Sequence, residues 1–248
     1  MIKGRFGNKT DIGLVRASNE DKALSLIDAD GTVLLCVCDG MGGYMKGDFA
    51  SKIATDIINA AFLSKKKWLF SFQVSNWVSK IIKSINYSVY SESSDGERFK
   101  GMGTTLVMAI FFKDNIYIAN IGDSRCYMLG EDKVIQLTRD QTYVEYLLSH
   151  NKITADEKLT SKDRHALMNF IGKDKTVDFE YKVVKNERKT ILLCSDGLYN
   201  NASDKQIFYA LNSDERLDQK ISTLIGIAKA NGGTDNIAVS MWEPYKND

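Results

Sequence analysis

The clearest chemical signal in this 248-residue chain is a set of aspartates at the ends of predicted strands, each with a glycine beside it or within two residues. Apolar runs bounded by glycine-rich breaks predict strands buried on both faces. Three of these aspartates follow such a run and the fourth precedes one. They are Asp39, Asp123, Asp196 and Asp235.

We expect the four carboxylates to meet on one rim, because in an antiparallel sheet the end of one strand lies beside the start of its neighbour. Packed carboxylates repel one another and raise each other's pKa unless cations are present. Asp side chains, backbone carbonyls and water are the ligands that Mg²⁺ and Mn²⁺ prefer. The pattern therefore favours a two-metal site. Structural Ca²⁺ is the alternative, although no EF-hand spacing occurs.

The other metal-binding residue types narrow the chemistry. The chain has only two histidines, His150 and His165, which excludes a His-rich zinc site. Its four cysteines follow no zinc or CxxC spacing and are expected to be buried, reduced thiols. No Ser-His-Asp or Cys-His constellation is visible. A pair of bound cations that activates water needs no such protein nucleophile.

Charge and hydropathy exclude several classes of protein. Lys and Arg number 33 against 32 Asp and Glu, so the net charge of +1 favours neither nucleic acid nor an anionic membrane as a partner. The longest apolar run, Leu106 to Phe112, is far too short to cross a bilayer, and the N-terminus lacks the apolar core of a signal peptide. We predict a cytoplasmic protein. With a single proline and no Pro/Gly/Ser-rich linker, we predict one domain over residues 1–248.

Hydrophobic periodicity places strands and long helices in separate blocks, which predicts an α+β fold. The stretch 106–137 is expected to form an antiparallel meander, and 179–184 is expected to pair with 190–194. Asp48 is a candidate cap for the first helix, and Lys65–Lys67 is expected to be a solvated helix end. The helices are predicted over 49–63, 72–91, 204–211 and 217–230, and the strands over 22–27, 33–38, 106–112, 115–121, 125–129, 134–137, 179–184, 190–194 and 236–242.

Seven short motifs occur in order from about Thr10 to Trp242, and together they resemble the metal-dependent Ser/Thr protein phosphatases of the PPM, or type 2C, family in their bacterial form. The motifs are Leu14-Val15-Arg16 with Asn19-Glu20-Asp21, Asp39-Gly40-Met41-Gly42-Gly43, Gly103-Thr104-Thr105, Gly122-Asp123-Ser124-Arg125, Leu137-Thr138-Arg139-Asp140, Ser195-Asp196-Gly197-Leu198 and Gly233-Thr234-Asp235-Asn236.

The resemblance implies a four-layer αββα sandwich, with two antiparallel β-sheets flanked by helices and a helical flap over about residues 141–170. It also implies a dinuclear Mn²⁺ or Mg²⁺ centre, with a third ion as in bacterial members. Asp21 would orient water, and Arg16 would bind the phosphate with its bidentate, always-charged guanidinium. The implied metal ligands are Asp39 between both ions, the Gly40 carbonyl, Asp196 and Asp235 on the first ion, Glu20 on the second, and Asp123 with Asp196 at the third site.

The activity implied is hydrolysis of phosphoserine and phosphothreonine in proteins without a covalent intermediate, reversing a bacterial Ser/Thr kinase. Family members of this size are usually monomers. Without the other motifs, an ion pair between Arg16 and Glu20 at i+4 would be the simpler reading.

Two positions depart from the family pattern. Met41 stands where many eukaryotic relatives carry a histidine, so the general acid is unassigned. Gln141 stands where the family usually has histidine, and the sequence assigns it no role. We expect His150 and His165 to be surface or packing residues rather than catalysts.

Two other classes of function compete with the phosphatase. A catalytically weak relative could bind a phosphoprotein as a regulator, but it should lack some metal carboxylates, and here all of them are present. A nucleotide-binding protein could use Asp39–Gly43 as a phosphate cradle. No Gly-Lys-Ser/Thr follows that loop, and no βαβ pattern surrounds it.

Overall fold

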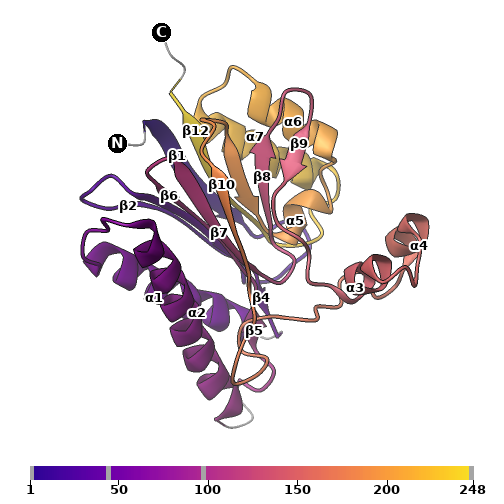
Figure 1. Cartoon of the computed structure of the whole chain (residues 1–248). Helices are drawn as coiled ribbons and strands as arrows, with labels where there is room; N and C mark the ends of the chain where they lie inside the picture. The colour runs from indigo at the N-terminus through magenta and orange to yellow at the C-terminus, as the bar shows by residue number, and fades with distance from the viewer. Residues whose placement is uncertain (1–2, 43–45, 96–98, 246–248) are drawn as a thin grey trace.

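Two five-stranded antiparallel sheets lie face to face at the centre of the computed structural model, and helices cover their outer faces (Figure 1). The structure describes residues 3–42, 46–95 and 99–245, so Gly43 of the predicted Asp39–Gly43 loop lies outside it. The predicted αββα sandwich is confirmed. The first sheet has the order β10-β7-β6-β3-β2, with β2 at Lys22–Ile27, β3 at Val33–Cys38, β6 at Leu106–Phe112, β7 at Asn115–Ile121 and β10 at Glu180–Lys185.

The second sheet carries both ends of the chain. Its strand order is β1-β12-β11-β8-β9, and a separate two-stranded ladder joins β4 to β5. The strands are β1 (Gly4–Asp11), β8 (Arg125–Leu129), β9 (Val134–Gln136), β11 (Ile191–Cys194), β12 (Ile237–Pro244), β4 (Gly40–Met41) and β5 (Gly103–Thr104).

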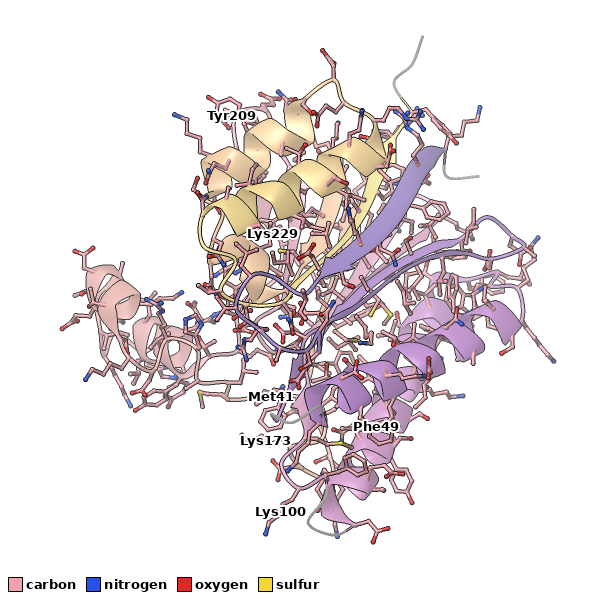
Figure 2. The ribbon with its side chains drawn as sticks, turned by 180° about the vertical axis from the view of Figure 1, so that it is seen from behind. Met41, Phe49, Lys100, Lys173, Tyr209 and Lys229 are labelled. Atoms are coloured by element: carbon pink, nitrogen blue, oxygen red, sulfur yellow. The ribbon has the colours of Figure 1, made fainter. Side chains whose placement is uncertain are left out.

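Helices form the two outer layers. The α1–α2 pair covers the first sheet and α5–α7 cover the second, as the positions of Phe49 in α1 and Lys229 in α7 show from behind (Figure 2). The short helices α3 and α4 project away from the sandwich (Figure 1). No helix within the described ranges is long and apolar enough to cross a membrane. The helices are α1 (Lys46–Ser64), α2 (Ser71–Ser94), α3 (Tyr143–Ser149), α4 (Ala155–Thr160), α5 (Asp196–Tyr199), α6 (Asp204–Asn212) and α7 (Leu217–Ala230).

Strand β3 shows why the apolar runs lack polar alternation. Successive side chains of a strand point to opposite faces. Leu34, Cys36 and Cys38 accordingly pack toward α1 and α2. Val33, Leu35 and Val37 pack into the layer between the two sheets. All six residues of β3 are buried, so the position of Asp39 at its end is set by packing on both faces.

Two predicted strand pairings are wrong. The stretch 106–137 is not one meander, because β7 belongs to the first sheet and β8 to the second, with the chain crossing between them at Gly122–Ser124. For the same reason the strands predicted at 179–184 and 190–194 do not pair: β10 pairs with β7, and β11 lies between β8 and β12. Alternation of apolar residues identifies a strand but not its partner.

Strand β1 is absent from the prediction. It pairs with β12 over all eight of its residues, although its sequence contains two glycines and no β-branched residue before Thr10. Because only one of its sides is hydrogen-bonded to a neighbour, it needs little apolar content, and its pattern resembles a loop.

Two smaller expectations also need correction. Asp48 lies inside the first turn of α1, where its carboxylate pairs with Lys22 instead of capping the helix. Lys65 is not solvated: its side chain is 5% exposed, its Nζ lies 2.6 Å from Asp28 Oδ2, and it sits 3.8 Å from the ring centroid of Trp68.

Replacing Lys65 with alanine should lower the free energy of unfolding by about 2–3 kcal/mol, because it leaves the buried Asp28 carboxylate without its cation. The neighbouring pair Lys67–Asp30 is a matched control. Lys67 is 66% exposed, so Lys67→Ala should cost less than about 1 kcal/mol. Urea denaturation of both variants measures the difference, and equal losses would contradict the assignment.

Candidate active site

A cavity of about 740 Å³ opens at the end of the sandwich where β3, β7 and β11 terminate and β12 begins. The predicted rim of four carboxylates is built from both sheets rather than one. Asp39 and Asp123 follow strands of the first sheet, whereas Asp196 follows β11 and Asp235 precedes β12, both of the second sheet. The predicted residues that line the cavity are Arg16, Glu20, Asp39, Gly40, Asp123, Asp196 and Asp235.

The backbone around Asp39 is held on both sides by two threonines. The Asp39 N–H donates to Thr105 Oγ1 at 3.0 Å, and the Asp39 carbonyl accepts from Thr104 Oγ1 at 2.9 Å and from the Thr105 N–H at 2.8 Å. Thr105 Oγ1 also contacts Ser124 Oγ at 2.7 Å, next to Asp123. Asp39 and Asp123 are therefore connected through a short chain of hydroxyl groups.

Two glycines, Gly40 and Gly47, let the start of α1 approach the segment that follows β3 closely. A Cβ added at Gly40 would lie 2.2 Å from the Gly47 carbonyl oxygen, and one added at Gly47 would lie 2.3 Å from Glu20 Oε2. The Glu20 carboxylate thus packs directly against the start of α1, at the edge of the cavity. Larger residues would displace it.

Asn236 connects the N-terminal segment to the second sheet. Its Nδ2 group donates to the carbonyls of Ile12 and Ser18, both at 2.9 Å, and its Oδ1 accepts from the Glu20 N–H at 2.8 Å. Together with the Leu14 N–H bond to the Gly233 carbonyl and the Ser51 hydroxyl bond to the Glu20 carbonyl, this side chain holds the loop of Arg16 and Glu20 over the cavity.

Arg16 pairs with an aspartate of the site rather than with Glu20 at i+4. Its Nη2 donates to Asp235 Oδ2 at 2.7 Å, and the Arg16 side chain remains 55% exposed. Asp235 Oδ1 accepts from the Asn236 N–H at 2.8 Å. The guanidinium therefore lies at the mouth of the cavity with donors left to bind an incoming anion.

The carboxylates perturb one another strongly. Burial and then the neighbouring carboxylates, Asp21 first, raise the pKa of Asp39 well above its usual range. Burial and the charge of Asp196 raise the pKa of Asp123 to about 8. Burial and the charge of Asp235 raise the pKa of Asp196 to about 6, although Asn200 donates to it at 3.1 Å. The site is poor in positive charge for the number of carboxylates it holds.

Asp21 lies behind the cavity and is 2% exposed. It shares hydrogen bonds with Ser195 and Asp39, and burial raises its pKa to about 7. Within the described residues its Oδ2 atom has no hydrogen-bond partner. A buried carboxylate oxygen without a donor is destabilising, so this atom is oriented for a donor such as water or for a cation.

Within the described residues, the side chains of the cavity do not by themselves enclose a position for a metal ion. Among the residues that the structure describes, no three Asp, Glu, His or Cys side chains surround one point closely enough to hold an ion. Arg16 instead donates to Asp235, and Asn200 donates to Asp196. Even so, the side chains that meet here present oxygen atoms, and burial together with their mutual repulsion raises the pKa values of Asp39, Asp123 and Asp196. The residues therefore fit hard divalent cations.

The comparison with known proteins identifies the family. The family model described as Protein phosphatase 2C matches residues 15–237 of the chain. The chain belongs to the protein phosphatase 2C family. It is 34% identical over 236 residues to the serine/threonine phosphatase stp of Listeria innocua, covering 95% of this chain and 94% of that protein.

Solved structures agree with this membership. The serine/threonine phosphatase Stp1 of Staphylococcus aureus superposes with a TM-score of 0.91 at 31% identity, covering 99% of this chain and 96% of that one. The catalytic domain of the protein phosphatase PstP, in complex with two manganese ions, superposes with a TM-score of 0.82 at 28% identity, covering 98% and 99%. The predicted family is confirmed, and the protein is a serine/threonine protein phosphatase.

Several residues of the phosphatase cavity escaped the sequence prediction. His165 is exposed, as expected, but it also lines the cavity, where its Nδ1 lies 3.8 Å from Asp196 Oδ2. Arg164 Nε donates to His165 Nε2 at 2.8 Å, so the ring proton belongs on Nδ1, facing Asp196. Partial burial and the Arg164 charge lower the pKa of His165. His150, by contrast, stacks on Tyr146 outside the cavity.

Gln141 has a definite structural role in the phosphatase. Its Oε1 accepts from the Gly122 N–H at 3.1 Å and from Asn169 Nδ2 at 2.8 Å, and its Nε2 donates to the Asn120 carbonyl at 3.2 Å. It therefore joins both ends of the flap to the turn that carries Asp123. Helices α3 and α4 form the flap, and the two ends of this flap meet at Gln141.

Neutralising one carboxylate should stabilise the metal-free phosphatase. A carboxyl group whose pKa is higher in the folded than in the unfolded chain contributes stability while protonated and loses it as the pH rises toward its folded value. In EDTA at about pH 8, Asp123→Asn should therefore raise the melting temperature, by on the order of 3 °C per kcal/mol of relieved repulsion. Differential scanning calorimetry measures the melting temperature. The exposed Asp132→Asn is the control, and an unchanged or lower melting temperature for Asp123→Asn would contradict the repulsion.

Proposed function

We propose that this protein removes phosphate from phosphoserine and phosphothreonine side chains of proteins, using two divalent cations, Mn²⁺ or Mg²⁺, held in the cavity. The observation that carries the proposal is the group of crowded, largely buried carboxylates with Arg16 at its mouth. The two manganese ions in the PstP relative support the cation requirement. The opposing enzyme would be a bacterial Ser/Thr kinase, and a cytoplasmic location suits that role.

The ligands would be the oxygen atoms already described. They are Asp39, the Gly40 carbonyl, Asp196, Asp235 and Glu20, with Asp123 and Asp196 forming a third position. Bound cations would supply the positive charge that lowers the pKa of water and stabilises phosphoryl oxygens.

Arg16 and Asp21 would position the phosphate and the attacking water. Arg16 is placed to donate two parallel hydrogen bonds to the phosphate, exchanging one of them with Asp235. Asp21, whose Oδ2 lacks a partner among the described residues, would accept a hydrogen bond from water and so orient it. Met41 lines the cavity but cannot donate a proton, so solvent or His165, which also lines the cavity, would protonate the leaving oxygen.

Activity toward p-nitrophenyl phosphate and a phosphothreonine peptide should disappear in EDTA and return with Mn²⁺ or Mg²⁺, because oxygen ligands release these cations to a chelator. Circular dichroism in EDTA is the control for loss of fold. Full activity after chelation and desalting would overturn the cation requirement.

Two substitutions should separate binding from chemistry. Asp39→Asn should lower kcat by on the order of a hundredfold or more. Arg16→Ala should mainly raise KM, by about tenfold to a hundredfold, since hydrogen bonds to charged groups contribute about 1.5–3 kcal/mol. Steady-state kinetics on the phosphopeptide measures both, with the 77% exposed Arg216 changed to alanine as control. Wild-type kcat in Asp39→Asn would refute the site.

A further inference from the structure

A second pocket, of about 700 Å³, lies at the opposite end of the sandwich from the carboxylate cavity. It is bordered by Thr32 before β3 and by Asp114 in the β6–β7 turn. Strand β3 separates Thr32 from Asp39, and a six-residue strand spans roughly 20 Å. The proposed phosphatase chemistry makes no use of this pocket.

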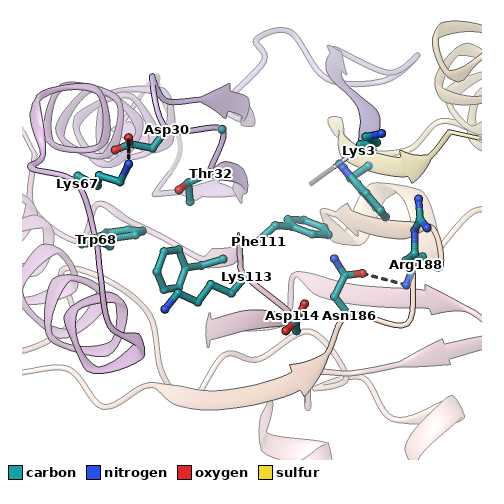
Figure 3. Close-up of a pocket in the computed structure, with 13 residues that line it drawn as sticks. Lys3, Asp30, Thr32, Lys67, Trp68, Phe111, Lys113, Asp114, Asn186 and Arg188 are labelled. Carbon is teal, nitrogen blue, oxygen red and sulfur yellow. Dashed lines mark hydrogen bonds and ion pairs between the residues drawn. The ribbon is translucent and has the colours of Figure 1, made fainter. Parts of the chain in front are cut away.

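Positive charge predominates around it. The lining contains four cationic side chains and two acidic ones. Lys67 is paired with Asp30 at 3.1 Å, and Lys113 Nζ donates to the Leu69 carbonyl at 2.7 Å. Figure 3 shows Lys3 and Arg188 together on one side of the pocket, across from Lys67 and Trp68.

Lys3 and Arg188 are the cations that remain available. Both are exposed, and neither forms an ion pair with any residue in the described part of the chain. Arg188 has a positive φ of 57°, and its N–H donates to Asn186 Oδ1 at 3.0 Å, which holds this tight turn beside the pocket. Two unpaired cations that line one pocket repel each other, and an anion bound in the pocket would reduce that repulsion.

The floor of the pocket contains an unsatisfied donor. Trp242 is 1% exposed and stacks on Phe111 with ring centroids 4.8 Å apart. Its indole Nε1–H has no hydrogen-bond acceptor among the described residues. A buried N–H without an acceptor is destabilising, but protein atoms cover this one, so Trp242 and Phe111 line the pocket as apolar surface and the cations around them carry the binding.

We propose that this pocket binds a small organic phosphate that also carries hydroxyl groups, as nucleotides and sugar phosphates do. Lys3 and Arg188 would hold the phosphate, since a guanidinium fork matches phosphate geometry. Asp114, whose carbonyl accepts from the Asn186 N–H beside Arg188, and Thr32, which lies toward Lys67, would bond to the hydroxyl groups, which an inorganic phosphate lacks (Figure 3). The pocket volume lies within the range typical of small-molecule sites.

Isothermal titration calorimetry with EDTA-treated protein tests the proposal, because without metal the carboxylate cavity repels phosphates. ATP or ribose 5-phosphate should bind saturably and more tightly than tripolyphosphate, and which of the two binds distinguishes nucleotide from sugar phosphate. The double variant Lys3→Glu/Arg188→Glu should lose at least about tenfold in affinity. Lys83→Glu, an exposed lysine on α2 away from the pocket, is the matched control and should bind like the wild type.

One further variant keeps the outcome decisive. Asp39→Asn should bind normally, since it alters only the other end of the sandwich. No saturable binding of either organic phosphate, tripolyphosphate binding as tightly as ATP, unchanged affinity in the double variant, or loss of binding in Asp39→Asn would overturn the proposal. Phosphopeptide hydrolysis is measured separately, so failure here and failure of the phosphatase proposal are distinguishable.

Discussion

The active site depends on holding several carboxylates close together after removing them largely from water. Each of these groups would be more stable protonated and dispersed, as the raised pKa values of Asp39 and Asp123 indicate. The surrounding fold opposes that tendency with buried strands, a close approach of α1, and hydrogen bonds from Thr104 and Thr105 to the Asp39 backbone. The stability of the sandwich is therefore what keeps the ligands assembled for cations.

Packing two sheets face to face confines polar chemistry to the ends of the sandwich. The layer between them is filled by residues such as Leu35, Phe111 and Leu193, which leaves no room for a ligand along the strands. One end collects acidic residues and the other collects cationic ones. The same strands, β3 and β12, connect both ends, so each end has its own chemistry on a shared framework.

The sequence predicts much of this structure and fails at identifiable places. Buried strands and long helices follow from periodicity, and the acidic strand ends pointed to Asp39, Asp196 and Asp235. The division of strands between two sheets did not follow, because β7 and β8 are joined by a short turn that looks like a hairpin. Side chains such as His165 and Arg164 reach the site only through tertiary contacts, and no local pattern marks them.

The pairing of β1 with β12 joins the first strand of the chain to the last. During synthesis the N-terminal segment emerges early but has no partner strand until the C-terminal residues have left the ribosome. Asn236 can therefore hold the loop of Arg16 and Glu20 only after the segment that carries Asn236 and β12 has been synthesised. A chain that stopped before Asp235 would carry Asp39 and Asp123 without Asp235 or the bonds of Asn236, so the carboxylate cavity is the last part of the fold to be assembled.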